Sequence, residues 1–495
     1  MSVANIWHKT YRYLGYHWII IGFPLDLHWS STGSARVHVS FTNCYAALPA
    51  SFIPNIYICR LMRFQPELAF QSLSVQNDWQ SEALKGTLAY LQQRSPFYGR
   101  LFRERNINIA NIRSLEDLTF LPTTDKADMQ QHKWEFLCVQ TLDVKEYTAT
   151  SGTLGNPVTI ALTEGDLQRL TYNERQSFLC ADGKPEDIYQ LMLTLDRQFM
   201  AGIAYYMGIR ELGAAMVRTG PGLPSMQWDT IFRLQSNSLV AVPSFMLRLI
   251  EHAREHQIDL SKTPVTKAVC IGESLRQGDF ELNALGEKIV SEWPIKLYST
   301  YASTEMQTAF TECGAGMGGH HQPDLIIFEI LDEDGNQLKQ GEYGEVAITT
   351  LGVEGMPLLR YRTGDICCYY DSKCSCGRTS RRLSPVAGRK QQMIKYKGTT
   401  LYPPAVFDML NSVPYVTEYV VEVFTNEIGT DELRLHLHTP LPVDDCERQL
   451  RPQLQAKLRV APMLHFHSAS EIQKMQFPPA TRKQVRFIDN RITTV

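Results

Sequence analysis

The sequence predicts an α/β protein with a large N-terminal domain of parallel or mixed sheets and helices, a β-rich subdomain, and a small α+β lid at the C-terminus. Three observations predict this. Short apolar runs alternate with helical stretches over residues 147–359, strand-like runs joined by Gly- and Asp-rich turns follow Asp324, and a shorter α+β pattern closes the chain. A chain of 495 residues also exceeds what one compact core holds, so at least two domains are expected.

The N-terminal part divides near residue 62. Residues 1–61 are aromatic-rich without a steady period, and we interpret them as an extension outside the working fold. From Pro66 to Arg94 the pattern is that of a surface helix, with Leu84, Leu88 and Leu91 at helical spacing. Residues 62–388 are predicted to form the main domain, and residues 389–495 the lid.

The central elements alternate as in a parallel sheet, where ligands bind outside the carboxyl ends of the strands. Strands are expected over residues 188–195, 239–243, 268–271 and 296–301, and helices over 167–178, 200–212 and 245–256. In the β-rich part, strands are expected over 325–331, 344–350 and 392–397. In the lid, strands are expected over 417–424 and 432–438 and a helix over 444–458.

Composition excludes several classes of protein. A net charge of −3 and a pI near 6.5 give no general attraction to nucleic acid or to an anionic membrane. No run reaches the 18 or so apolar residues that a membrane span needs. The 11 cysteines are odd in number and unevenly spaced, which favours reduced thiols in a cytoplasmic protein.

The most informative stretch is residues 147–157, Tyr-Thr-Ala-Thr-Ser-Gly-Thr-Leu-Gly-Asn-Pro. Hydroxyls and glycines at this density let a loop turn its backbone N–H groups inward and bind oxyanions. The stretch is not a Walker loop, because no G-x-x-x-x-G-K-[ST] occurs in the chain. Taken alone, it fits a polar hairpin as well as a phosphate cradle.

Three further segments accompany this loop. The run 301–305 supplies a hydroxyl and a carboxylate after a strand, and the run 361–365 supplies another carboxylate on a tight turn. Near the C-terminus, Lys483 places a cation in a segment without a core role. A lone lysine is usually a solvated side chain, but the order of the four segments favours a nucleotide site.

Together these segments resemble the adenylate-forming superfamily of acyl- and aryl-CoA synthetases, and specifically its phenylacetate–CoA ligase branch. The resemblance runs from about Pro66 to Arg491 and includes Ser-Pro-Phe-Tyr at 95–98. It implies roles for the following residues. Thr150, Ser151, Gly152, Thr153 and Gly155 would contact phosphates, Glu305 would hold Mg²⁺, and Thr304 would contact phosphate. Gly272 and Glu273 would line the adenine pocket, and Tyr301 would lie beside adenine or the acyl pocket. Asp365 would bind the ribose, Arg389 would start the lid, and Lys483 would contact the reacting carboxylate and the α-phosphate.

The resemblance implies ATP, Mg²⁺, coenzyme A and a small aryl acid as cofactors and substrates, with a mobile lid that pivots at 389–391. Four departures from the branch pattern are Leu154, Asn156, Ala302 and the pair Gln391-Gln392, which stands where acidic hinge residues are usual. Two alternatives stay open: loading of a carrier-protein phosphopantetheine arm, and a degenerate nucleotide-binding relative. A homodimer is also compatible with the sequence.

Cys374 and Cys376 form a C-x-C pair before Gly377. Two reduced surface cysteines would explain the pair, but Cys313 and His320 lie upstream and complete a Cys₃His set. Such a set forms closed tetrahedral structural Zn²⁺ sites, and some members of the resembling branch have a similar arrangement. His321 competes with His320 for the fourth position.

Overall fold

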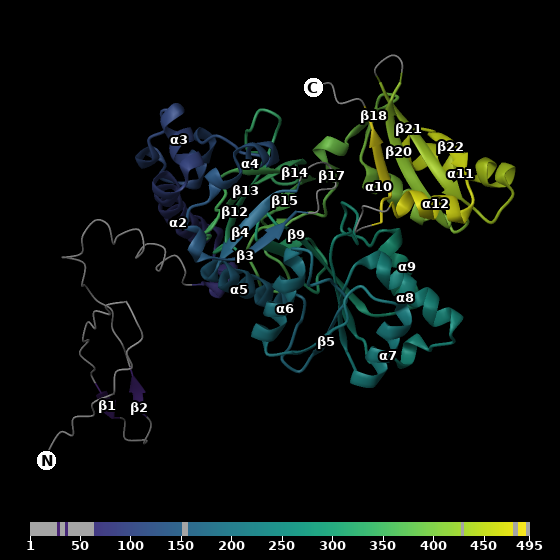
Figure 1. Cartoon of the computed structure of the whole chain (residues 1–495), viewed down its shortest axis with the longest axis horizontal. Helices are drawn as coiled ribbons and strands as arrows, with labels where there is room; N and C mark the ends of the chain where they lie inside the picture. Colours follow the sequence, from purple (N-terminus) through teal and green to yellow (C-terminus); the bar gives the residue numbers. More distant parts are fainter. Residues whose placement is uncertain are drawn as a thin grey trace. The chain divides into compact units, whose positions relative to one another are not determined.

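Figure 1 shows the computed structural model of the chain. It describes residues 64–150, 157–426, 430–478 and 484–491, together with the backbone of two short paired strands, β1 (Leu27–Trp29) and β2 (Ala35–Val37). The chain divides into two compact units, Met1–Ile53 and Pro54–Val495. The assignment of residues 1–61 as an extension stays a prediction.

A nine-stranded mixed sheet forms the centre of the second unit, in the order β15-β16-β11-β10-β9-β8-β7-β5-β6. Its parallel half consists of β5 (Ile188–Leu191), β6 (Ala215–Arg218), β7 (Ser238–Ala241), β8 (Lys267–Cys270) and β9 (Lys296–Ser303). The antiparallel half consists of β10 (Thr308–Glu312), β11 (Gly319–His320), β15 (Tyr369–Tyr370) and β16 (Arg382–Leu383). The predicted α/β class is therefore confirmed.

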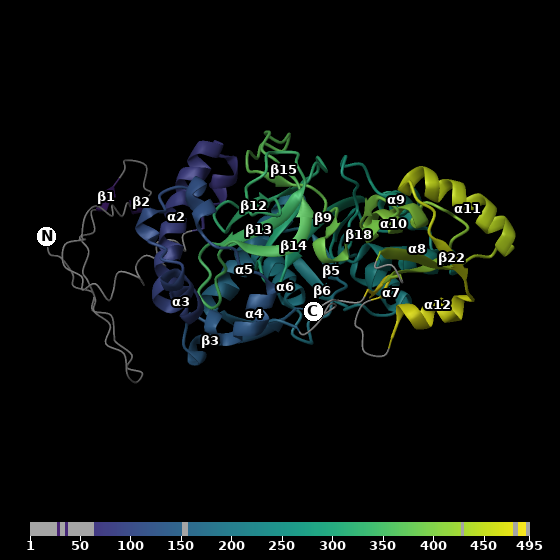
Figure 2. The same ribbon diagram turned by 90° about the horizontal axis from the view of Figure 1, so that it is seen from above.

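Helices connect the strands of this sheet (Figure 2). They are α6 (Met200–Leu212), α7 (Pro224–Leu234), α8 (Pro243–Glu255), the short η6 (Leu260–Lys262) and α9 (Ala284–Glu292), whereas α5 (Glu164–Cys180) precedes β5. Helix α5 starts at the N-cap Thr163, whose hydroxyl accepts from the Asp166 amide while the Asp166 carboxylate accepts from the Thr163 amide. This capping box satisfies amides of the first turn and defines the helix start.

The β-rich part contains an antiparallel sheet of β12 (Ile326–Leu331), β13 (Gly344–Thr350), β14 (Tyr361–Cys367) and β17 (Gly388–Arg389). A separate hairpin joins β3 (Val144–Ala149) to β4 (Thr159–Thr163). Before it come α3 (Pro96–Glu104), η2 (Ile109–Asn111), η3 (Leu115–Phe120), α4 (Lys126–His132), η4 (Lys133–Phe136) and η5 (Thr141–Asp143).

Three expected elements differ from the structure. The helix predicted over 66–94 is broken into η1 (Pro66–Phe70) and α2 (Leu73–Arg94), because Ser72 caps the second helix with its side chain. The strand expected over 188–195 ends at Leu191. The strand expected over 392–397 is reduced to β18 (Ile394–Tyr396), since the 3₁₀ turn η7 (Lys390–Gln392) occupies its start.

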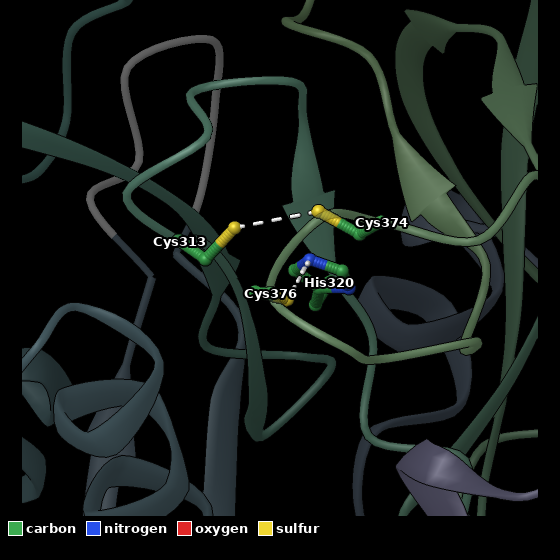
Figure 3. Close-up of side chains that lie close together, drawn as sticks. All are labelled: Cys313, His320, Cys374 and Cys376. Carbon is green, nitrogen blue, oxygen red and sulfur yellow. Dashed lines mark hydrogen bonds between the residues drawn. The ribbon is translucent and has the colours of Figure 1, made fainter.

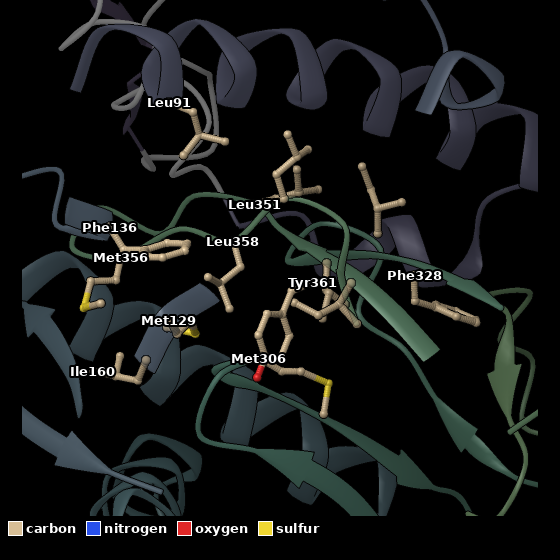
Figure 4. Packing of buried hydrophobic residues seen from close by; sticks show 14 of the residues in the cluster. Leu91, Met129, Phe136, Ile160, Met306, Phe328, Leu351, Met356, Leu358 and Tyr361 are labelled. Carbon is tan, nitrogen blue, oxygen red and sulfur yellow. The ribbon is translucent and has the colours of Figure 1, made fainter. Parts of the chain in front are cut away.

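Helix α2 lies on the β-rich part and contributes to the largest apolar cluster (Figure 4). Leu84, Leu88 and Leu91 are all buried on one face, as the helical spacing predicts, and Figure 4 shows Leu91 above Leu351 and Leu358. The buried face is thus the apolar stripe that the sequence predicts. The helix packs against the domain through this face.

The C-terminal part has its own apolar cluster, built from residues between Ile394 and Phe487. Its sheet has the order β22-β21-β20-β23, with β20 (Glu418–Thr425), β21 (Asp431–His438), β22 (Met463–Phe466) and β23 (Phe487–Asn490). Helices α10 (Pro403–Asn411), α11 (Val443–Leu458) and α12 (Ala469–Gln476) accompany it, and β19 (Thr399–Leu401) pairs with β18. Among the described residues, no helix has the length and apolar character needed to cross a membrane.

Candidate active site

The hairpin β3–β4 carries the predicted phosphate loop between its strands. Thr150 closes the loop, since its amide donates to the Val158 carbonyl (2.9 Å) and its hydroxyl accepts from the Val158 amide (3.0 Å). Four predicted loop residues, Ser151, Gly152, Thr153 and Gly155, lie outside the described residues, as do the departures Leu154 and Asn156. The hairpin that presents the loop is therefore described, whereas its phosphate contacts stay a prediction.

The turn between β9 and β10 brings the predicted metal and phosphate residues next to β14. The hydroxyl of Tyr361 on β14 donates to Glu305 Oε1 (3.5 Å). Thr304 precedes Glu305 and is, like it, half-buried. Tyr361 received no role from the sequence, although it opens the 361–365 run. The half-buried glutamate thus faces a tyrosine from the β-rich sheet.

Asp365 links three of the predicted nucleotide residues. Its Oδ2 accepts from the hydroxyl of Tyr301 (2.7 Å), and its Oδ1 accepts from Nε of Arg389 (3.1 Å). Burial raises the pKa of Asp365, and the neighbouring Arg389 opposes this shift. Burial and the Asp365 charge also raise the pKa of Tyr301 well above its usual value, so the phenol stays a hydrogen-bond donor. A buried carboxylate with fixed donors is suited to bind hydroxyl groups.

Gly272 and Glu273 follow β8, at the carboxyl end of a parallel strand. Gly272 has a φ of 78°, which side-chain-bearing residues rarely adopt, so the turn requires glycine. The Glu273 carboxylate accepts from the Ser244 amide (2.8 Å) in the first turn of α8. Glu273 therefore helps to hold α8, and its predicted place near adenine stays a prediction.

Lys483 lies outside the described residues, and nothing in the structure tests its role. The chain on its C-terminal side is described from residue 484 and runs into β23, which pairs in parallel with β20 of the lid sheet. Gln391 lies in the 3₁₀ turn η7, between the last strand of the β-rich sheet and β18.

Cys313, His320, Cys374 and Cys376 converge as the sequence predicts (Figure 3). Their ligand atoms all lie within 4.8 Å of one another, with 3.5 Å between the sulfurs of Cys313 and Cys374 and 3.5 Å from Cys376 Sγ to His320 Nε2. Ligands about 2.3 Å from a tetrahedral zinc would be roughly 3.8 Å apart. The side chains as they stand thus fit a closed Cys₃His site.

The surroundings also suit a metal. Burial alone would raise the pKa of the Cys376 thiol, but hydrogen bonds with His320 and Arg378 lower this pKa to about 5. The low pKa favours the thiolate, which is the form that binds metals. The other ring nitrogen of His320 lies 3.5 Å from Ser380 Oγ, a contact that orients the ring. All nine cysteines in the described part of the chain are free thiols.

The structure decides between the two histidines. His320 and His321 are neighbours, so their side chains leave the backbone in opposite directions. The ring of His321 packs on Phe328 (5.2 Å between centroids), and its Nδ1 contacts the Arg381 carbonyl (3.0 Å). His321 is therefore a core residue. The sequence missed Cys180, which packs beside Cys313 and Cys374 but contacts the Thr311 carbonyl (3.3 Å) with its thiol.

Comparison with known proteins finds similar sequences among coenzyme A ligases. Residues 146–355 match the family described as AMP-binding enzyme, a range that contains the predicted phosphate loop and Glu305. The chain is 29% identical over 390 residues to a phenylacetate–coenzyme A ligase of Thermus thermophilus, covering 77% of this chain and 85% of the relative. It is 27% identical over 337 residues to the phenylacetate–coenzyme A ligase of Escherichia coli, covering 66% and 73%. The chain thus matches the AMP-binding enzyme family over residues 146–355 and is similar to phenylacetate–coenzyme A ligases over most of its length.

A solved structure of 2-hydroxyisobutyryl-CoA ligase in the postadenylation state superposes on this chain with a TM-score of 0.75. The identity is 20%, and the match covers 91% of this chain and 96% of that one. The same ligase in its thioesterification state gives a TM-score of 0.62 at 21% identity, covering 86% of this chain and 92% of that one. At these identities the likeness establishes the fold.

Proposed function

We propose that this chain is an ATP-dependent carboxylate–CoA ligase that forms an acyl-adenylate and releases AMP and pyrophosphate, with an aryl acid of the phenylacetate type as substrate. The observation that carries the proposal is that β9 and the turn after it meet β14, where Tyr301 contacts Asp365 and Glu305 contacts Tyr361. The relatives named phenylacetate–coenzyme A ligase support the substrate class. Residues 62–388 would form the adenylating domain and residues 389–495 the lid.

The first half-reaction brings two anions together, since a carboxylate attacks the α-phosphorus of ATP. Catalysis therefore consists mostly of positioning and charge neutralisation. Glu305 and the triphosphate would hold Mg²⁺, which supplies charge neutralisation on the phosphate oxygens when bound. Thr150 and the loop after it would bind phosphate oxygens, Asp365 would accept from the ribose hydroxyls, and Lys483 would neutralise the charge that develops at the reaction centre.

The second half-reaction opens the acyl-adenylate to the thiol of coenzyme A. The new C–S bond forms as the bond between the acyl carbon and the AMP oxygen breaks, and AMP leaves. One arrangement of the lid cannot both place Lys483 on the α-phosphate and admit the thiol, so the lid rotates between the two steps.

The free thiols of the described residues support a reducing, cytoplasmic location.

Acid-dependent ATP–pyrophosphate exchange tests the adenylation step directly. We expect exchange with at least one member of a panel of aromatic and aliphatic acids, and we expect Glu305→Ala to abolish it because the metal loses its carboxylate ligand. Glu251→Ala, on the exposed side of α8, is the matched control and should exchange normally.

Other outcomes would identify the alternatives. Exchange without a thioester on free coenzyme A, but with one on a holo-carrier protein, would show that the acceptor is a carrier-protein arm. The absence of exchange with every acid would show a degenerate nucleotide-binding relative and contradict the proposal.

We also propose that Cys313, His320, Cys374 and Cys376 hold a structural Zn²⁺. Three thiolates and one imidazole close the tetrahedron, so no position stays open for substrate. Cys313 directly follows β10, and β10 pairs with β9, which leads to Thr304 and Glu305. The metal would therefore stiffen the end of β10 that lies away from the turn with Thr304 and Glu305, without taking part in the reaction.

Purified protein is expected to contain about one zinc per chain, measured by plasma mass spectrometry, and Cys374→Ser should lose most of it. The variant should also melt at a lower temperature, because the remaining cysteines and His320 lose the metal ion that would hold them together. Cys446→Ser, a buried thiol of α11 outside the cluster, controls for the substitution itself. A wild-type protein that is free of metal and keeps its melting temperature in chelator would contradict the zinc site.

A further inference from the structure

The connection between the β-rich sheet and the lid is fixed to the large domain up to residue 390. Arg389 pairs with Asp365 across β17 and β14, and its Nε also donates to the Asp365 carboxylate (3.1 Å). The next side chain, Lys390, contacts the buried carboxylate of Glu345 (3.2 Å), which Arg362 also holds. Two successive residues are thus attached to β13 and β14.

From residue 391 onward the same connection is fixed to the lid by Arg491, directly after β23. Its Nη2 donates to the Gln391 carbonyl and its Nη1 to the Met393 carbonyl, each at 2.7 Å. Asp489 accepts from Nε (2.9 Å) and Nη2 (2.6 Å), and Asp431 accepts from Nη1 (3.4 Å). All five N–H groups of the guanidinium therefore have acceptors, and the side chain is only 20% exposed.

Asp431 extends this attachment further along the chain. The carboxylate oxygen that faces Arg491 also accepts from the Lys395 amide (2.8 Å), the middle residue of β18. Residues 391, 393 and 395 are thus tied to the first residue of β21 or to the end of β23. The two sets of contacts meet between Lys390 and Gln391.

We propose that Arg491 is a positioning residue that clamps residues 391–393 to the lid and so confines the rotation of the lid to the Lys390–Gln391 linkage. The inference rests on the two-step function proposed above. With the clamp, one linkage separates two rigid bodies. Without it, the joint would extend over several residues, and the lid would lose a defined position in each half-reaction.

The consequence for catalysis follows from where Arg491 stands. It lies eight residues after Lys483, in the segment that β23 attaches to β20. A displacement of a reacting group by about 1 Å costs on the order of 10²-fold in rate. A looser joint should therefore lower the rate of adenylation, while ATP and the acid still bind to the large domain.

Lysine cannot replace arginine in this role. Its ammonium has three donors around one point, whereas the planar fork of Arg491 reaches two carbonyls and two carboxylates at once. If Arg491 acted only as a positive charge between Asp431 and Asp489, the Arg491→Lys variant would keep the activity of the wild type. If it acts as a clamp, the lysine variant should resemble Arg491→Ala.

The test compares the full-length wild type with Arg491→Ala, Arg491→Lys and the control Arg434→Ala, which removes an arginine of the same lid sheet paired with Glu422 (2.8 Å). Both Arg491 variants are expected to lower kcat for ATP–pyrophosphate exchange at least about tenfold with KM for ATP unchanged. Hydrogen exchange should accelerate at the amides of Met393 and Lys395, while the amides of β20 and β21 keep their protection. Arg434→Ala should change neither readout.

Three results would overturn the clamp. These are an unchanged kcat in Arg491→Ala, full rescue by Arg491→Lys, and faster hydrogen exchange throughout β20 and β21, which would indicate general loosening of the lid. If the wild type shows no exchange with any acid, the proposed function fails. In that case hydrogen exchange at the amides of Met393 and Lys395 still tests the clamp, because this measurement does not depend on activity.

Discussion

Replacing Lys483 by alanine is expected to lower the rate of acid-dependent ATP–pyrophosphate exchange by roughly 10²–10³-fold, the scale of removing one donor to a developing oxyanion. Attack of the acid on the α-phosphorus gathers negative charge at one centre. An ammonium placed there stabilises the transition state more than the separate substrates, so its loss should lower kcat while KM for ATP changes little. Exchange at saturating ATP measures this effect.

The second half-reaction provides the internal control. Transfer of the acyl group from a preformed acyl-adenylate to coenzyme A uses the other lid position, so Lys483→Ala should carry it out at a rate close to that of the wild type. Lys474→Ala, an exposed lysine on α12 of the same lid, should leave both half-reactions unchanged. Exchange that survives in Lys483→Ala would contradict the role given to this residue.

The elements of the fold were predictable where the sequence repeats with a clear period. The runs at 200–212 and 344–350 coincide with α6 and β13 because apolar periodicity and burial agree there. The break at Gln71–Ser72 was missed, since it depends on one side-chain cap that interrupts an otherwise helical pattern. Local caps and turns decide boundaries, and a periodicity averaged over several turns does not resolve them.

The site was predictable as a set of segments and not as a set of contacts. Residues 301–305 and 361–365 each stood out by composition, but the contact between Glu305 and Tyr361 joins positions 56 residues apart through two different sheets. The choice of His320 over His321 likewise depends on the pairing of β11 with β10 and β16, which sets the face that each ring takes. Registers of this kind are not readable from one sequence.

A buried glutamate carries the second large prediction. Glu174 lies on α5 against Gly208 of α6, where an added Cβ would approach the Glu174 Cβ to 2.3 Å, so the two helices are in close contact. Its Oε1 accepts from the side-chain amide of Asn173 (3.0 Å), and its Oε2 has no partner among the described residues. Burial raises the pKa of this carboxyl from 4.5 to about 8. The folded chain therefore keeps Glu174 protonated at neutral pH.

The sign of the pH dependence follows from the proton count. Between pH 4.5 and about 8 the unfolded chain has lost the Glu174 proton and the folded chain retains it, so the free energy of unfolding falls as pH rises. At about 1.4 kcal/mol per pH unit, the loss over this window is on the order of 4 kcal/mol. The glutamine of Glu174→Gln is neutral at every pH, so the variant does not undergo this loss of stability. Its free energy of unfolding should therefore rise relative to that of the wild type as pH increases.

Denaturant unfolding of both proteins at several pH values between 5 and 8.5 measures this difference. Any fixed cost of placing the glutamine amide in the site changes the free energy of unfolding of the variant by the same amount at every pH. The titration of Glu174 is therefore tested by how the difference in unfolding free energy between the two proteins grows with pH. Glu251→Gln, at an exposed position of α8, is the matched control for the substitution. A difference for Glu174→Gln that is flat across the window would mean that the carboxyl ionises in the folded chain. Water or a ligand would then have to reach Oε2, since an isolated carboxylate is not stable in an apolar contact between helices.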